Sequence, residues 1–275
     1  MADGRPEDTG LPPELRLLRG ITSRLPPLPR MAGVGNHLAR RFYLRKPRSP
    51  VVAEVRGFQM ELDPAELVDG LLLFGPQLHD RREVRFLQRH LRPGDTFLDL
   101  GAYIGFYSLL ASRLVGPEGR VFSVEPEPAS FERLSGNLDR NRADNVLPIQ
   151  AGLSDQRETR TLYVDCSGNR GSSSFLHGDG LAVSVACAPL PTLMAEHGFE
   201  AASVAKLDLE GMEFRVLDHW FDHLEAPHRP RALIVEHHPG LVALAGGHTP
   251  DLLRAMGYRL RRGSRHNLLA MRGAL

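Results

Sequence analysis

Residues 95–105 read Asp-Thr-Phe-Leu-Asp-Leu-Gly-Ala-Tyr-Ile-Gly, and an apolar stretch follows at residues 106–114. This order predicts a strand, a tight glycine turn and a helix in immediate succession. In such a turn Gly101 lets the backbone approach a ligand, and the helix that follows Gly105 offers free N–H donors. The spacing is Gly-x-x-x-Gly, and the missing middle glycine argues against a dinucleotide pyrophosphate. Asp99, just before the turn, suits a ligand that carries a positive charge, such as the ammonium group of an amino-acid moiety.

The composition of the chain limits its class. It has 275 residues, enough for one large α/β domain with appendages or for two small domains, and its net charge is +1. Composition therefore gives no indication of a nucleic-acid partner. Cys166 and Cys187 are the only cysteines, which fits a reducing compartment, and we expect a cytoplasmic location. The polar N-terminus is unlike a secretory signal, and without an apolar run of about 18 residues we expect no membrane span.

The chain divides into three regions by pattern. Residues 1–50 are rich in proline and arginine, and short helices are predicted at 13–19 and 34–44. Residues 51–82 predict a β-hairpin around Gly57 followed by a linker. Residues 83–275 form the main domain. It contains an insertion at 159–188 that we expect to shape the substrate site. The N-terminal region also holds basic residues that could contact an acidic partner or a membrane surface, although we favour a solvated face or a cap: Arg40, Arg41, Arg45, Lys46 and Arg48.

Helices and strands alternate through the main domain. After a helix at 83–92, strands are predicted at 96–100, 120–125, 146–150, 203–209, 232–236, 258–262 and 268–272. Further helices are predicted at 106–115, 128–142, 191–197, 212–220 and 250–256. This alternation predicts an α/β fold with a mostly parallel seven-stranded sheet and helices on both faces. Only a short turn separates the last two strands, so we expect a terminal antiparallel hairpin.

Polar residues follow four of the predicted strands, and ligands of open α/β sheets bind at the carboxyl ends of the strands. Glu125 ends the second strand about 20 residues after the glycine turn, where an acid can accept both hydroxyls of a ribose. Asp155, after the third strand, can lie beside an adenine. The fourth strand runs into Lys-Leu-Asp-Leu-Glu-Gly-Met-Glu at residues 206–213, and the fifth into Glu-His-His-Pro at 236–239.

Together these motifs resemble those of the FkbM family of S-adenosylmethionine-dependent methyltransferases. The resemblance covers about residues 80–240 and includes Asn137 with Asn141. Residues 206–213 match every fixed position of the family's Lys-[Ile/Leu]-Asp-x-Glu-Gly-x-Glu motif, whereas Tyr103 stands where the family often has Asn. The resemblance implies a Rossmann-like class I methyltransferase that O-methylates hydroxyls of sugars, polyketides and related metabolites.

The resemblance also implies which residues bind the cofactor S-adenosylmethionine. The glycine turn would wrap its methionine part, Glu125 would hold its ribose, and residues after the third strand would edge its adenine. The implied cofactor-binding residues are Asp99, Gly101, Ala102, Tyr103, Gly105, Glu125, Leu153, Asp155 and Asp208.

An oxygen nucleophile needs a proton acceptor, and the candidates are Asp208, Glu210, His237 and His238, although at most one of the two histidines should face the pocket. Structural roles compete with these. Lys206 is as well explained by an ion pair with Asp208 or Glu236 as by catalysis, and for Glu213 we favour capping or a pair across the following helix. The same carboxylates and histidines could bind a divalent metal, but their spacing is not diagnostic and we do not favour one.

Two other functions stay open at this point. A nicotinamide-dependent oxidoreductase could use a similar sheet, although its Gly-x-Gly-x-x-Gly is missing. A non-catalytic methyltransferase-like module could also keep the fold. The acceptor, beyond a hydroxyl of a small molecule or glycan, and the oligomeric state do not follow from the sequence.

A thermal-shift experiment separates the cofactor classes. We expect S-adenosylmethionine and S-adenosylhomocysteine to raise the unfolding midpoint, because a ligand that binds only the folded state stabilises it. NAD should have no effect, and stabilisation by NAD alone would contradict a methyltransferase.

Overall fold

The computed structural model describes residues 13–22, 50–176, 178, 180–238, 246–264 and 266–273. The chain forms two compact units, one of Met1–Arg81 with Ser167–Gly171 and one of Arg82–Cys166 with Ser172–Leu275. The predicted helix at 34–44 and the basic set between Arg40 and Arg48 lie outside the described residues.

The smaller unit contains the predicted hairpin. Strands β1 (Val51–Val55) and β2 (Phe58–Leu62) pair antiparallel, and alternate residues of both are buried. Helix α1 (Pro13–Thr22) occurs where a helix was predicted, and helix α3 (Leu67–Phe74) falls in the stretch interpreted as a linker. The apolar run of α3 is short and interrupted by Gly70, so its sequence lacks a clear helical period.

The larger unit is built on a seven-stranded sheet of order β11-β12-β10-β9-β3-β4-β5. Strand β12 is antiparallel to both neighbours, and the pairs among β10, β9, β3, β4 and β5 are parallel, as predicted. The strands are β3 (Thr96–Leu100), β4 (Arg120–Val124), β5 (Val146–Ile149), β9 (Val204–Leu207), β10 (Ala232–Glu236), β11 (Arg259–Arg262) and β12 (Asn267–Met271).

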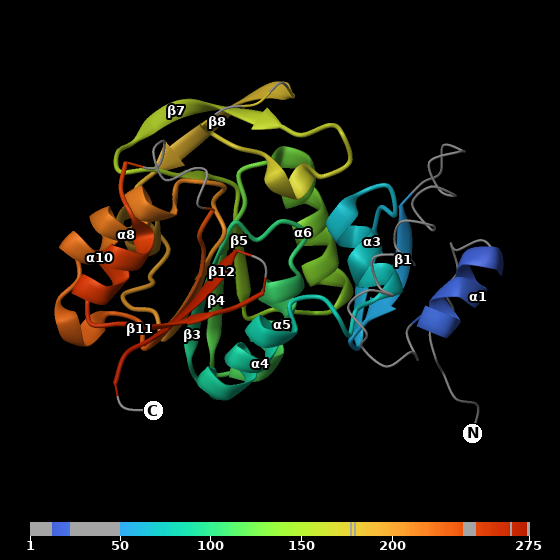
Figure 1. The fold of residues 1–275 in the computed structure, drawn as a ribbon, viewed down its shortest axis with the longest axis horizontal. Helices are drawn as coiled ribbons and strands as arrows, with labels where there is room; N and C mark the ends of the chain where they lie inside the picture. The colour runs from blue at the N-terminus through green and yellow to red at the C-terminus, as the bar shows by residue number, and fades with distance from the viewer. Residues whose placement is uncertain are drawn as a thin grey trace. The chain divides into compact units, whose positions relative to one another are not determined.

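Helices cover both faces of this sheet (Figure 1). On one face Leu98, Leu100 and their neighbours on adjacent strands pack in one core with residues of α7 (Leu190–Glu196), α8 (Glu213–Asp222) and α10 (Thr249–Ala255). The other face carries α5 (Phe106–Val115), which contacts β3 and β4. Helix α6 (Pro128–Arg140) contacts β5, and α4 (Arg81–His90) is hydrogen-bonded through Arg82 and Glu83 to the turn after β11. None of the helices in the described ranges is long and apolar enough to cross a bilayer.

The insertion forms a sheet of its own. Strands β7 (Glu158–Val164) and β8 (Leu181–Ala188) are antiparallel, and the short β6 (Gly152–Leu153) adds to β8 in parallel. A single-turn helix, η1 (Arg170–Ser172), lies between β7 and β8. A second single-turn helix, η2 (Ala226–His228), lies outside the insertion, between α8 and β10. The sequence indicated two β-like stretches here but gave no sign of β6, since two residues carry no periodicity.

The turn after β3 depends on the absence of a side chain at Gly101. This residue has φ +79°, and a Cβ built on it would lie 1.9 Å from the carbonyl oxygen of Asp208, just beyond β9. Two strand ends therefore approach each other more closely than any alanine permits.

We expect Gly101→Ala to destabilise the protein more than Gly94→Ala, which serves as the matched control. Both residues have positive φ, but nothing lies within 4 Å of a Cβ at Gly94. The control should lose about 1 kcal/mol for backbone strain, and Gly101→Ala a further 1–3 kcal/mol, roughly, for overpacking. Denaturant unfolding measures both, and equal losses would show that the close approach is unimportant.

Candidate active site

Hydrogen bonds from two neighbouring elements fix the glycine turn. The N–H groups of Gly101 and Ala102 donate to Val124 O at 2.9 and 3.0 Å. The Asn137 side chain on α6 donates to Ile104 O at 3.0 Å. The turn is thus held against the carboxyl end of β4 before any ligand arrives, which is the preorganisation that a tight binding loop requires.

Glu125 joins the turn to the start of α6. Its Oε2 accepts from Tyr103 N at 2.7 Å, and its Oε1 accepts from Glu127 N at 2.9 Å. Burial raises the pKa of Glu125 to about 7, although both backbone hydrogen bonds favour the charged form. Each oxygen keeps a further lone pair, so the carboxylate is oriented to accept two more hydrogen bonds, as the predicted ribose role requires.

Asp99 lies beneath the turn and is fully buried. Its Oδ2 accepts from Ser108 Oγ of α5 at 2.6 Å, and Ser123 of β4 donates to the same hydroxyl at 2.8 Å. Its Oδ1 has no hydrogen-bond partner among the described residues. Burial raises the pKa of Asp99, opposed by the charge of Lys206, so the site holds an incompletely satisfied acid directly behind the cofactor turn.

Lys206 is the buried cation of the site. Its Nζ donates to Asp208 Oδ2 at 3.0 Å and to Gly101 O at 3.3 Å, and it lies 5.2 Å from the centre of the Tyr107 ring. Burial alone would lower the pKa of Lys206, but the charges of Asp208 and Asp99 outweigh burial and raise it. The predicted ion pair with Asp208 is therefore confirmed.

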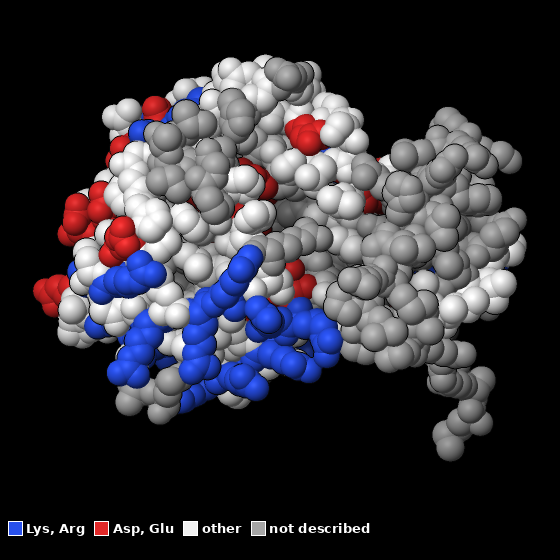
Figure 2. Space-filling view, viewed as in Figure 1, with Lys and Arg blue, Asp and Glu red and all other residues white. Residues whose placement is uncertain are grey.

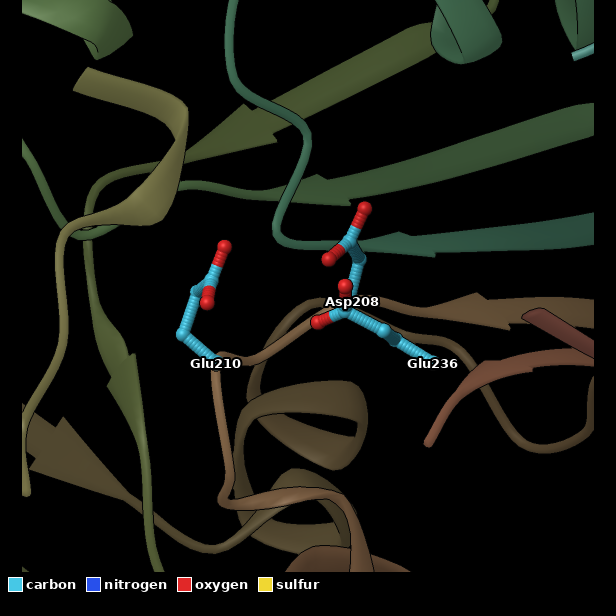
Figure 3. Close-up of side chains that lie close together, drawn as sticks. All are labelled: Asp208, Glu210 and Glu236. Carbon is cyan, nitrogen blue, oxygen red and sulfur yellow. The ribbon is translucent and has the colours of Figure 1, made fainter. Parts of the chain in front are cut away.

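Three carboxyl groups meet beyond the ends of β9 and β10. Oxygens of Asp208, Glu210 and Glu236 lie within 4.8 Å of one another. In Figure 3 the carboxyls of Asp208 and Glu236 lie against each other, and that of Glu210 faces them from the next stretch of backbone. Burial, then the neighbouring carboxylates, raises the pKa of Glu210 to about 8 and that of Glu236 to about 10. Near neutral pH both glutamic acids therefore hold a proton beside the ion-paired Asp208.

The backbone that carries Glu210 is held by Glu213. Glu210 has φ +49°, a strained value for a residue other than glycine. Glu213, buried at the start of α8, accepts from Leu209 N at 2.6 Å and from Gly211 N at 3.1 Å. These donors belong to the loop before α8, and the helix itself, with Met212 as its N-cap residue, has no side-chain cap hydrogen bond. The capping role favoured for Glu213 is therefore not observed, and its contacts instead hold the backbone on either side of Glu210.

The remaining predicted residues lie in other surroundings. His237 donates its backbone N–H to His266 O at 2.9 Å, and its ring packs edge-on against His248. Burial and then the neighbouring histidines lower the pKa of His237. Leu153 is buried in β6, and Asp155 lies 3.9 Å from Arg215 with both side chains partly exposed. Their catalytic and adenine-binding roles stay predictions.

Sequence reasoning did not propose Glu236 as a site residue. The signal was present, because parallel neighbours end at the same edge of a sheet and Glu236 ends β10. In the register Ile234 lies opposite Lys206, so Glu236 falls beside Asp208. Predicting that Glu236 lies beside Asp208 requires knowing that β9 and β10 are neighbours in the sheet.

The insertion contacts this same edge. Ser174 Oγ donates to the carbonyl of Glu210 at 3.1 Å, and the Arg160 guanidinium lies 4.0 Å from the sulfur of Met212. Residues of β7 and of the segment between β7 and β8 thus adjoin the loop that carries Glu210.

A mostly parallel sheet of this order, with a glycine turn after its central strand and an acid ending the next, is a Rossmann-like fold that binds its ligand at the carboxyl ends of the strands. The family model for the methyltransferase FkbM domain matches residues 99–260. The chain belongs to this family and is an S-adenosylmethionine-dependent methyltransferase. The alternative of a nicotinamide-dependent oxidoreductase is therefore set aside.

Individual relatives agree with this assignment. The chain is 25% identical over 194 residues to the hexuronic acid methyltransferase AglP of Haloferax volcanii, covering 70% of this chain and 77% of that protein. It is 31% identical over 202 residues to the 31-O-demethyl-FK506 methyltransferase FkbM of Streptomyces tacrolimicus, covering 61% and 74%. Among solved structures, the methyltransferase FkbM of Methylobacillus flagellatus aligns with 16% identity and a TM-score of 0.43, covering 86% of this chain and 58% of that one.

The pKa of Glu125 predicts pH-dependent cofactor binding. In the predicted ribose role Glu125 accepts hydrogen bonds more strongly when ionised than when protonated, and with a pKa of about 7 it takes up a proton as the pH falls through neutrality. We expect S-adenosylhomocysteine affinity to fall about tenfold from about pH 8 to about pH 6, since hydrogen bonds to charged groups are the stronger ones.

Glu125→Gln should bind weakly at both pH values and lose this dependence. Glu118→Gln, which alters an exposed acid of the same unit, should behave as the unaltered protein in calorimetry. A pH dependence that survives in Glu125→Gln would exclude the ribose role.

Proposed function

We propose that the protein transfers the methyl group of S-adenosylmethionine to a hydroxyl oxygen of a small molecule, a secondary metabolite or a sugar. The observation that carries this proposal is the cluster of Asp208, Glu210 and Glu236 at the edge of the sheet where the cofactor turn lies. The cofactor supplies an already activated methyl group, so the residues of this chain have to align the acceptor and take its proton.

The charges of the site suit that task. Lys206 pairs with Asp208 at 3.0 Å, so Asp208 is the member of the cluster that faces a cation. Glu236 hydrogen-bonds to Asp208, so a proton held between these two carboxyls is shared by both. An acceptor hydroxyl that donates to Asp208 would pass its proton into a set of carboxyls already arranged to hold it.

The names of the relatives support the acceptor class. One is named for a hexuronic acid and another for an oxygen of FK506, so the two names support a sugar or a metabolite as the acceptor. A cytoplasmic location, the absence of a nucleic-acid partner and the domain boundaries at residues 50 and 82 remain predictions.

Asp208→Asn tests the proton acceptor. We expect kcat toward a hydroxylated acceptor, found by screening sugars and metabolites for methyl uptake, to fall roughly a hundredfold or more, the usual effect of losing general-base catalysis. S-adenosylhomocysteine affinity should change less than about threefold. Asp218→Asn, an exposed acid on α8, is the matched control.

Because Asp208→Asn leaves Lys206 buried without its partner, Glu210→Gln provides a second variant whose fold is safer. Full turnover in both variants would contradict the proposal. Dialysis against a chelator checks the divalent-cation alternative, and we expect turnover to be unchanged.

A further inference from the structure

Arginine side chains gather on one side of the larger unit, over α4 and the edge strand β11 (Figure 2). Four come from α4 and its end and two from β11, and all six are exposed: Arg82, Arg85, Arg89, Arg92, Arg259 and Arg261. We call this set the arginine face. The chain as a whole is nearly neutral, with 34 basic and 33 acidic residues, so the face reflects segregation of charge rather than a general excess.

The register explains why these residues share one side. Leu260 of β11 lies opposite Ala270 and packs in the core under α8 and α10. Side chains alternate along a strand, so Arg259 and Arg261 point to the opposite side of the sheet. Arg82 donates to the carbonyl of Gly263 at 3.0 Å, which brings the start of α4 to the end of β11 on that same side.

The acids of the described residues leave the charge of the six guanidinium groups uncompensated. Within the described part of the chain, none of them forms an ion pair with a carboxylate. The one acid of α4, Glu83, is buried and accepts from the backbone N–H of Ser264. Like charges held together without compensation repel one another, and a polyanion that approaches this face relieves that repulsion.

The face runs the length of the sheet. At one end Arg82 adjoins the β11–β12 turn, whose His266 carbonyl accepts from the backbone N–H of His237, the residue that follows Glu236 of the carboxylate cluster. At the other end Arg231, which precedes β10, donates to the carbonyl of His90 at the end of α4. One end of the arginine face is therefore at the catalytic edge of the sheet.

The chemistry of the face limits its partner. Protein–protein interfaces bury an apolar core within a polar rim, and the large exposed apolar residues of the described chain are Leu17, Ile21 and Leu181, none of which belongs to the face. Single-stranded nucleic acid is bound largely through aromatic stacking, and no aromatic side chain is among the six. A broad surface of phosphates needs neither, because clusters of four to eight basic side chains suffice for anionic lipids.

We propose that the arginine face binds the anionic surface of a lipid bilayer and holds the catalytic edge of the sheet close to it. The contact is peripheral and electrostatic, and it does not depend on which acceptor the active site uses.

Vesicle sedimentation tests the proposal. The full chain should bind phosphatidylcholine vesicles that contain about one third phosphatidylglycerol, not phosphatidylcholine alone, and binding should fall steeply as salt shortens the range of the attraction. The triple variant Arg85→Gln, Arg89→Gln, Arg261→Gln should bind at least about tenfold more weakly, as the loss of three surface contacts implies.

A second triple variant, Arg140→Gln, Arg142→Gln, Arg254→Gln, removes the same charge from exposed positions elsewhere on this unit and should bind within about twofold of the unaltered protein. Both triples should keep their S-adenosylhomocysteine affinity, which shows that they fold. Failure of the unaltered protein to bind anionic vesicles, or an equal loss in both triples, would overturn the proposal. Tighter binding of a DNA duplex than of vesicles through the same arginines would overturn it in favour of a nucleic-acid partner.

Discussion

The buried ammonium of Lys206 is the contact on which the active site depends. It hydrogen-bonds to Gly101 O in the glycine turn and to Asp208 in the loop after β9. It therefore joins two segments separated by about a hundred residues. A buried lysine is costly unless paired, and here both Asp208 and Asp99 compensate it. The same interaction that neutralises this charge also holds the glycine turn against Asp208, the residue that follows β9.

The acids around Lys206 are not equivalent. Asp99 accepts a hydrogen bond from Ser108, and Glu125 accepts from the backbone of the glycine turn and of Glu127 before α6. Glu213 accepts from the backbone N–H of Leu209. Each of these is positioned by N–H or O–H donors. Asp208, Glu210 and Glu236 instead face one another. Within this cluster Asp208 also accepts from Lys206 Nζ, so it is the carboxyl that links the cluster to the glycine turn.

Much of this arrangement is predictable from the chain. Strand β3, helix α5 and strand β10 have the bounds that apolar periodicity indicated, because each is a buried run with clear ends. Helix α3 and strand β6 were not predicted, since one contains a glycine and the other has only two residues. The position of Glu236 required knowledge of which strands are neighbours, and no local pattern contains that information.

The insertion has a consequence for how the protein could have changed over time. Its tip, Ser167–Gly171, belongs to the smaller unit, whereas the strands on either side belong to the larger. Within the smaller unit Arg170 N donates to Glu66 at 2.9 Å, and Leu67 N donates to Gly168 O at 2.9 Å. The two units are therefore not separable modules along the chain: exchange of the first 81 residues for those of another protein would leave this tip without its hydrogen-bond partners. The tip of the insertion and the N-terminal region therefore have to be inherited together.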